Sequence, residues 1–214
     1  MKLRSLAGTT GLAGRSSINP TGRPLRWMAY GLVALAVLAA ACSGSTQPIV
    51  KLGLIAPFEE LYRDDGYAAL HAVKLAIGKR NAAGGVAGRQ VALVALNDNG
   101  RPDEAARQAA KLGVDRDVLG VVGPLRGATD AAAGPVLTAD GLPWLSLSDQ
   151  QPGDFVPAAD FVAAYRSLAG VDPTPQAVRA YDAANRLLDA MEWAGRSGPL
   201  TRDTVHVALE QSVR

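Results

Sequence analysis

The stretch Val118–Asp130, with the sequence VLGVVGPLRGATD, decides the fold. Its apolar first residues predict a buried strand, which ends at Gly123-Pro124. The step Gly127-Ala128-Thr129-Asp130 then begins a helix. Small ligands bind at such a point of an α/β sheet, because the first N–H groups of the helix have no partner and point at them. We therefore expect a ligand-binding loop between this strand and this helix.

The sequence on both sides of this stretch alternates between strand and helix patterns. Strands are predicted at 50–56, 91–96, 118–122 and 143–147, and helices at 66–81, 102–112 and 127–138. Short loops between strictly alternating elements predict an α/β fold with a doubly wound parallel sheet in three α-β-α layers. Further helices are predicted at 175–194 and 202–211, after a helix that contains Phe161.

The N-terminal region differs in charge and hydropathy from the rest of the chain. Residues 1–42 hold five of the 22 basic residues and none of the 20 acidic ones, which leaves a net charge of about −3 on residues 43–214. A net-acidic body without a Lys/Arg cluster argues against nucleic-acid binding. Trp27–Ala41 is apolar or small over about 15 residues, the length of a signal-peptide core and short of the roughly 20 that span a membrane.

This apolar stretch ends in Leu38-Ala39-Ala40-Ala41-Cys42 and resembles a bacterial lipoprotein signal, in which the cysteine is acylated and becomes the new N-terminus. Cys42 is the one cysteine of the chain and cannot form an internal disulfide, so a lipid anchor is the better use for it. The alternative is an ordinary cleaved signal with an incidental cysteine. The anchor predicts an exported protein, held at the outer face of the bacterial cell membrane or in the periplasm.

Four segments, in a fixed order, carry a resemblance to a known family. They are IAP at 55–57, NAAGGVAGRQVAL at 81–93, GVVGP at 120–124 and GLPWLSLSD at 141–149. Residues 50–149 resemble the first lobe of type I periplasmic solute-binding proteins, the leucine/isoleucine/valine-binding kind that supply ABC transporters. The resemblance implies an amino-acid-like solute and an ABC permease as partners.

The end of the chain resembles a much later part of the same family. The segments DFVAAYRSLAGVDPTP (160–175) and AYDAANRLLDAMEWAG (180–195) match the helix pair with which such chains return to the first lobe after building a second. Here a short link takes the place of that second lobe, which is expected to be missing. The predicted organisation is a signal at 1–42, a tether at 43–49, the first part of the lobe at 50–149, the link at 150–157 and the returning helices at 158–214.

The resemblance also implies a ligand site on the loops that follow the strands. The positions with which the family holds an amino acid's carboxylate and ammonium fall on Gly127, Ala128, Ser148 and Asp149. Arg126 could clamp an anionic ligand and Asp149 could meet an ammonium, or both could be solvated loop charges. Tyr62 would supply an aromatic wall, or simply pack.

The sequence gives no support to an enzyme, a cofactor or a metal site. It contains no phosphate-binding loop and no HExxH, CxxC or GxSxG motif, and its two histidines lie in predicted helices. Two functions remain. The first is a lipid-anchored solute-binding protein of an ABC importer. The second is a homologue that no longer binds solute and serves as an interaction module, or is the product of a degenerate gene.

The missing lobe separates these two functions. High affinity in two-lobed binders comes from both lobes closing on the ligand, so a single lobe presents an open shelf. A homodimer would restore a second wall. It predicts an exposed apolar patch near Tyr67 and Leu70, or along 168–171.

Overall fold

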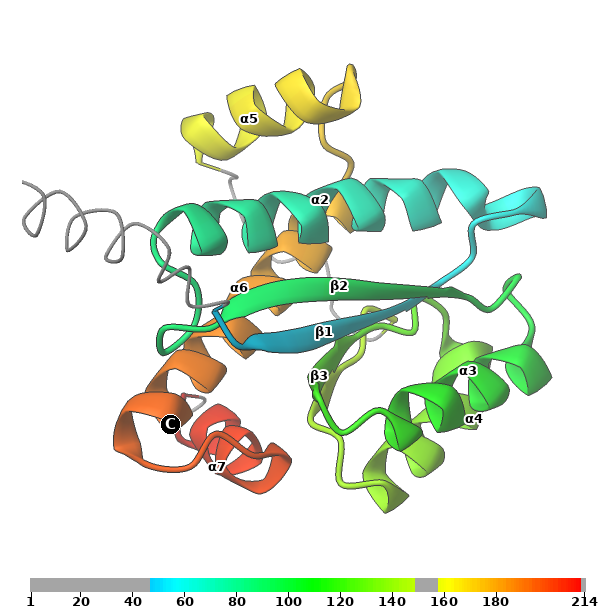
Figure 1. The fold of residues 1–214 in the computed structure, drawn as a ribbon. Helices are drawn as coiled ribbons and strands as arrows, with labels where there is room; N and C mark the ends of the chain where they lie inside the picture. Colours follow the sequence, from blue (N-terminus) through cyan, green and yellow to red (C-terminus); the bar gives the residue numbers. More distant parts are fainter. Residues whose placement is uncertain (1–46, 149–157, 213–214) are drawn as a thin grey trace, which may run out of the picture. The chain divides into compact units, whose positions relative to one another are not determined.

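The computed structural model describes residues 47–148 and 158–212, and every structural statement below concerns these two ranges (Figure 1). The predicted signal with Cys42, the tether up to residue 46, Asp149 and the link 150–157 lie outside the described residues. Within the described part of the chain, no helix has the length and apolar character needed to cross a membrane.

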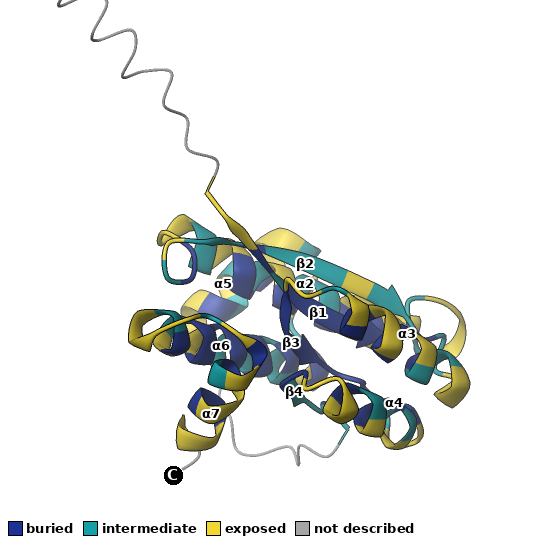
Figure 2. Ribbon diagram, turned by 60° about the horizontal axis from the view of Figure 1, so that its bottom comes forward, coloured by how far each residue is buried: buried dark blue, intermediate teal, exposed yellow. Residues whose placement is uncertain are grey.

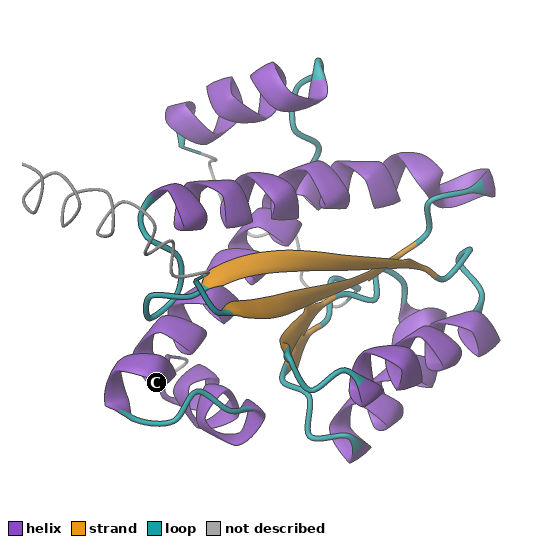
Figure 3. Cartoon of the chain, viewed as in Figure 1, coloured by secondary structure: helices purple, strands orange, loops and turns teal. Residues whose placement is uncertain are grey.

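Four parallel strands form one sheet, as the alternating pattern predicted. The order of the strands in the sheet is β2-β1-β3-β4. Their bounds are β1 Ile49–Ala56, β2 Gln90–Asn97, β3 Val118–Val122 and β4 Trp144–Leu145. The first strand lies in the middle and pairs with β2 on one side and with β3 on the other. Because all strands run the same way, the loops that follow them meet at one end of the sheet (Figure 3).

The last strand is shorter than the prediction of 143–147. The hydroxyl of Ser146 accepts a hydrogen bond from the backbone N–H of Ser148 at 3.0 Å, a local turn that competes with an extended backbone. Pro143 has no N–H to donate to a ladder. Only Trp144 and Leu145 therefore pair with β3 as a strand.

Helices cover both faces of the sheet. Their bounds are η1 Glu60–Tyr62, α2 Arg63–Ala82, α3 Pro102–Val114, α4 Gly127–Ala139, α5 Ala159–Ala169, α6 Pro175–Ser197 and α7 Arg202–Ser212. A large apolar core lies between the sheet and α2 with α6, and a smaller one lies between the opposite face and α3 with α4 (Figure 2). The three α-β-α layers of the prediction are confirmed.

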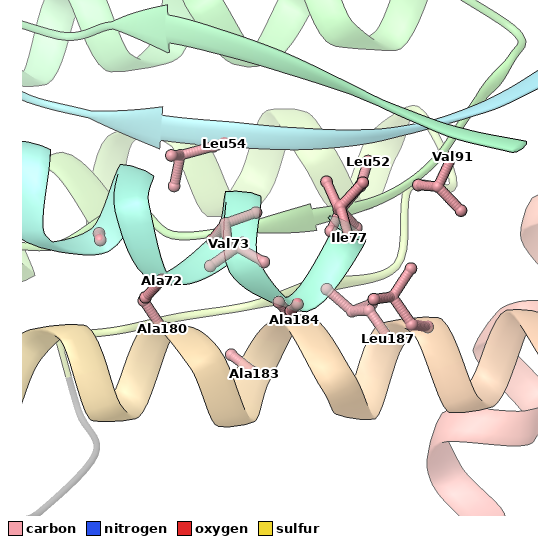
Figure 4. Packing of buried hydrophobic residues seen from close by; sticks show 14 of the residues in the cluster. Leu52, Leu54, Ala72, Val73, Ile77, Val91, Ala180, Ala183, Ala184 and Leu187 are labelled. Atoms are coloured by element: carbon pink, nitrogen blue, oxygen red, sulfur yellow. The ribbon is translucent and has the colours of Figure 1, made fainter. Parts of the chain in front are cut away.

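The contact between α2 and α6 is made largely by alanine. Ala72, Ala180 and Ala184 are fully buried, and Figure 4 shows them between the two helices beneath Leu52 and Leu54 of β1. Side chains of this size let two helices approach closely while both still face the sheet. At the far end of the pair, Arg80 of α2 forms an ion pair with Asp189 of α6.

Helix α2 begins at Arg63, three residues before the predicted start at Gly66. Asp64 and Asp65 lie in its first turn, where carboxylates are stabilised by the helix dipole. Gly66 is required for packing and does not mark the helix start. A Cβ atom at this position would lie 1.6 Å from the carbonyl oxygen of Pro57, in the loop after β1.

The amino-terminal end of the sheet is tied to α7 by one buried arginine. Arg202 is 8% exposed, and its guanidinium donates hydrogen bonds to several backbone carbonyls. The acceptors are the carbonyl oxygens of Leu112, Gly113, Asp115, Val118 and Asp140, at 2.7–3.4 Å. One side chain thus joins the ends of α3 and α4, the start of β3 and the start of α7.

Candidate functional site

Tyr62 and Arg126, from the loops after β1 and β3, meet at the carboxyl end of the sheet. The guanidinium carbon of Arg126 lies 3.5 Å from the centroid of the Tyr62 ring, a close cation–π contact. The stack uses the face of the guanidinium, so its N–H edges remain able to bind an anion. Both side chains are partly exposed. The sequence placed both residues in the binding edge, and the structure brings them into contact.

The loop after β2 packs against the Tyr62 ring of this stack. Gly100 has a φ of +67°, and a Cβ atom there would lie 2.9 Å from Cδ2 of Tyr62. Asn97 holds the neighbouring loop, because its Oδ1 accepts hydrogen bonds from the N–H groups of Phe58 and Asn99, both at 2.9 Å. Three of the four loops at this edge are therefore locked together around Tyr62.

The start of α4 offers backbone donors next to Arg126. Arg126 is the N-cap residue, and no side chain caps the helix there. The hydroxyl of Thr129 donates to the carbonyl oxygen of Arg126 at 2.9 Å, so it does not compete for the N–H groups of the first turn. Gly127 and Ala128 are exposed, and their N–H groups have no intrahelical acceptor. Such an end favours an anionic group of a ligand.

Ser148 is held against this helix start. Its hydroxyl donates to Oδ2 of Asp130 at 3.0 Å and lies 2.8 Å from the hydroxyl oxygen of Ser146. Asp130 in turn lies in the first turn of α4. Ser148 is thus held at the first turn of α4, the helix that begins at Gly127. The place of Asp149 lies outside the described residues.

Two carboxylates at this edge were missed by the sequence reasoning. Asp130 puts a negative charge three residues after Gly127, in a stretch quoted only for its helix start. Asp98 follows β2 and is fully buried. One of its oxygens accepts from the N–H of Gly100 at 2.8 Å, and the other has no hydrogen-bond partner among the described residues. The signal for Asp98 was the polar run NDNG at the end of a predicted strand.

Burial raises the pKa of the Asp98 carboxyl above its ordinary value of 3.8. The N–H of Gly100 and the positive charge of Arg126 oppose this shift. Asp98 lies near the Tyr62–Arg126 stack, because Gly100, whose N–H donates to its carboxylate, lies close to the ring of Tyr62. The edge therefore combines a fixed cation with two acidic groups and a row of open N–H donors.

This arrangement can bind a small polar molecule. A cation and a helix start suit a carboxylate, and an acidic group close by suits an ammonium. Among the described residues, no group of three or more His, Cys, Asp or Glu side chains is placed to hold a metal ion. The charged groups at this edge can hold a molecule that carries both a carboxylate and an ammonium.

Comparison with known proteins identifies the family of the chain. The sequence model of the family described as "Periplasmic binding protein" matches residues 49–158, about half of the chain. The chain therefore belongs to the periplasmic binding protein family, whose members are solute-binding proteins of the ABC-transporter type. A comparison with curated proteins gave no match.

Solved structures share the fold at low sequence identity. A putative branched-chain amino acid ABC transporter from Rhodospirillum rubrum is 19% identical, with a TM-score of 0.66 over 75% of this chain and 88% of that one. The substrate-binding protein LivJ from Streptococcus pneumoniae, in complex with isoleucine, is 14% identical, with a TM-score of 0.66 over 75% and 87%. A solute-binding protein from Rhodopseudomonas palustris, in complex with 3,4-dihydroxybenzoic acid, is 16% identical, with a TM-score of 0.63 over 75% and 84%.

Proposed function

We propose that this chain is an extracytoplasmic solute-binding protein of an ABC importer, and that it binds a small zwitterionic solute of the amino acid type. One observation carries the proposal. Arg126, held on Tyr62, stands beside the open start of α4, while Ser148 and Asp130 flank the same helix start. A carboxylate and an ammonium of one ligand thus each have a complementary group.

The structural neighbours support this ligand class but do not narrow it to one compound. Two of them carry branched-chain amino acid transport in their names, and one was solved with an aromatic acid. All of these ligands share a carboxylate. The proposal therefore rests mainly on the groups that would bind this carboxylate, which are Arg126 and the N–H groups of Gly127 and Ala128.

Calorimetric titration tests the proposal. The purified chain is titrated with isoleucine, glutamate, asparagine and 3,4-dihydroxybenzoate, and we expect dissociation constants on the order of micromolar to millimolar, because the site is open on one side. Arg126→Met should weaken binding at least about tenfold. Arg63→Met, an exposed change at the start of α2, is the matched control and should leave the affinity unchanged. A folded chain that gives no heat with any of these compounds contradicts the proposal.

We propose further that Cys42 carries a lipid that anchors the protein to the outer face of the cell membrane. The support is the sequence LAAAC at the end of an apolar stretch and the use of the chain's one cysteine. In cells fed an alkyne-labelled fatty acid, the wild-type chain should take up label and sediment with membranes. Cys42→Ser should do neither, whereas label on the Cys42→Ser chain would place the lipid elsewhere.

A homodimer remains a proposal with partial support. Tyr67, Leu168 and Val171 are 45%, 49% and 60% exposed, so the apolar patch predicted on α2 and after α5 exists in part. Leu70 is partly buried against the core instead. Analytical ultracentrifugation of the wild type and of Val171→Lys measures the proportions of monomer and dimer. The substitution should shift the equilibrium towards the monomer.

The interaction-module function is favoured by a different observation. The described residues form one lobe with a single sheet, and β4 at its edge pairs on one side only. A solute bound at the carboxyl end of that sheet is covered by no second sheet among these residues.

A further inference from the structure

The outer side of β4 presents main-chain groups that no strand among the described residues covers. The carbonyl oxygens of Pro143 and Leu145 accept hydrogen bonds from Val121 and Gly123, each at 2.9 Å. Main-chain groups alternate sides along a strand, so the N–H and C=O of Trp144 point away from β3. β4 is the last strand in the sheet order, so no strand among residues 47–148 and 158–212 pairs with this donor and acceptor.

A cavity of about 330 Å³ lies along this edge. Its apolar lining comes from Leu142 and Leu209, both more than nine-tenths buried, with Trp144 and Leu145 of β4. Thr138 and Gly141 at the end of α4 line one side, and residues of α6 and α7 line the other. Figure 2 shows β4 between α4 and the α6–α7 pair. We call this cavity, with the outer edge of β4, the β4 slot.

The charged groups around the β4 slot leave it net negative. Asp203 and Glu210 of α7 and Arg186 of α6 line it. Among the described residues neither Arg186 nor Asp203 forms an ion pair, and Glu210 meets only His206, with Nε2 and Oε1 3.4 Å apart. His206 is charged only when protonated, so the two carboxylates of Asp203 and Glu210 outnumber the one guanidinium of Arg186.

We propose that the β4 slot binds an extended segment of another protein, which adds as a strand to the outer edge of β4. The segment would place an apolar side chain on the face of Leu142, and a lysine or arginine on the opposite face beside Asp203 and Glu210 of α7. The main-chain pair of Trp144 supplies the two hydrogen bonds that an added strand needs. This binding is separate from solute binding at the carboxyl end of the sheet.

A second copy of the chain fits this slot less well. Residues of α4 line one side of the cavity and residues of α6 and α7 line the other, so whatever pairs with β4 has to enter between these helices. A second copy would bring the helices that flank its own β4 into the same space. A single extended strand has the shape that enters this space, and its basic side chain complements the negative rim.

A peptide titration tests the proposal with the intact chain. The probe is a dye-labelled, acetylated and amidated pentapeptide, Ser-Val-Lys-Val-Ser, followed by fluorescence anisotropy. We expect saturable binding and at least about tenfold weaker binding when Lys is replaced by Glu in the peptide. N-methylation of the one peptide residue whose N–H donates to the carbonyl oxygen of Trp144 should abolish binding, whereas N-methylation of its immediate neighbours should not, because their N–H groups face away from β4.

Variants of the protein complete the test. Asp203→Lys and Glu210→Lys change exposed residues and should weaken binding of the lysine peptide and improve binding of the glutamate peptide. Asp64→Lys, at the other end of the molecule, is the matched control and should change neither affinity. Arg126→Met should leave peptide binding intact, so the outcome is distinct from that of the solute titration.

Three results would overturn the proposal. The first is a folded chain that binds none of the peptides. The second is binding that responds equally to N-methylation at every position, which means that main-chain pairing is not used. The third is displacement of the peptide by free isoleucine at equal concentration, which would make the β4 slot a small-molecule site. Self-association blocked by the peptide would also overturn it, in favour of a second copy.

Discussion

Arg202 at the amino-terminal end of the sheet and Arg126 at the carboxyl end differ in how their guanidinium groups are used. Arg202 is 8% exposed and donates to the carbonyl groups of five residues. Arg126 is partly exposed and rests with its face on Tyr62. The N–H groups of Arg202 donate to the backbone and stabilise the fold, whereas the N–H groups of Arg126 remain available to a ligand. The contrast separates the end that stabilises the lobe from the end that can bind.

Replacing Arg202 tests this contrast most strongly. Arg202→Met should lower the free energy of unfolding by at least about 4 kcal/mol, because five carbonyl groups, some of them only partly buried, lose their donor at about 1–3 kcal/mol for each fully buried one. Urea unfolding followed by circular dichroism measures the change. Arg116→Met, an exposed neighbour without an ion pair among the described residues, should change the stability by less than about 0.5 kcal/mol. Similar losses for both variants would contradict the clamp role of Arg202.

A pair of glycines on α2 tests the packing at the carboxyl end. Gly66→Ala should lower the stability by about 3 kcal/mol, because its Cβ would collide with the carbonyl oxygen of Pro57. Gly78→Ala on the same helix should raise it by about 0.5–1 kcal/mol, since nothing lies within 4 Å of the added atom. Thermal unfolding of the two variants gives opposite signs if the close approach is as described.

The same substitution at Arg126 should have little effect on folding. Arg126→Met removes one partly exposed cation–π contact, worth about 0.5–1 kcal/mol at exposed sites. We therefore expect an unfolding free energy within about 1 kcal/mol of wild type, together with the loss of solute affinity described above. A loss of stability as large as that of Arg202→Met would mean that both ends of the sheet use their arginine structurally.

The smallest expected effect concerns pH. The folded-state pKa of Asp98 is raised by burial above its ordinary value of 3.8, so the folded chain holds this proton more tightly than the unfolded chain. Asp98 therefore makes the stability fall as the pH rises from about 4 through the raised pKa, and its contribution is flat below that range. In Asp98→Asn this fall should be absent when unfolding is measured from pH 4 to pH 8. A fall of equal slope in the variant would assign it to other groups.

The sequence predicted the order of the elements well because the patterns of the strands are local. Runs such as Val118–Val122 have one apolar residue after another and are ended by Gly-Pro, so both their type and their end can be recognised. The start of α2 could not be recognised in the same way. Gly66 suggested a helix start, but glycine is needed there because the carbonyl oxygen of Pro57 lies against its Cα. The two residues are nine positions apart, and no local pattern predicts this contact.

The site was predictable only to the level of the loops. Tyr62 and Arg126 were named from the loops that follow strands, and Ser148 because the family resemblance implied it. The structure places Tyr62 on Arg126. The partner of Ser148 is Asp130, 18 residues away along the chain, and nothing in the sequence pairs them. Asp98 was hidden for a related reason, since a polar run after a strand does not show which of its carboxylates is buried. Tertiary packing determines both the pairing of Ser148 with Asp130 and the burial of Asp98.

The alanine contact between α2 and α6 also limits how this sequence can drift over evolutionary time. At fully buried positions such as Ala72, Ala180 and Ala184, a smaller residue means glycine, which weakens a helix, and any larger one drives the two helices apart. Neither direction offers a neutral step. Related sequences should therefore keep alanine at these positions while the exposed side chains around them change freely. The spacing of these alanines should be retained even in relatives whose overall sequence identity to this chain is low.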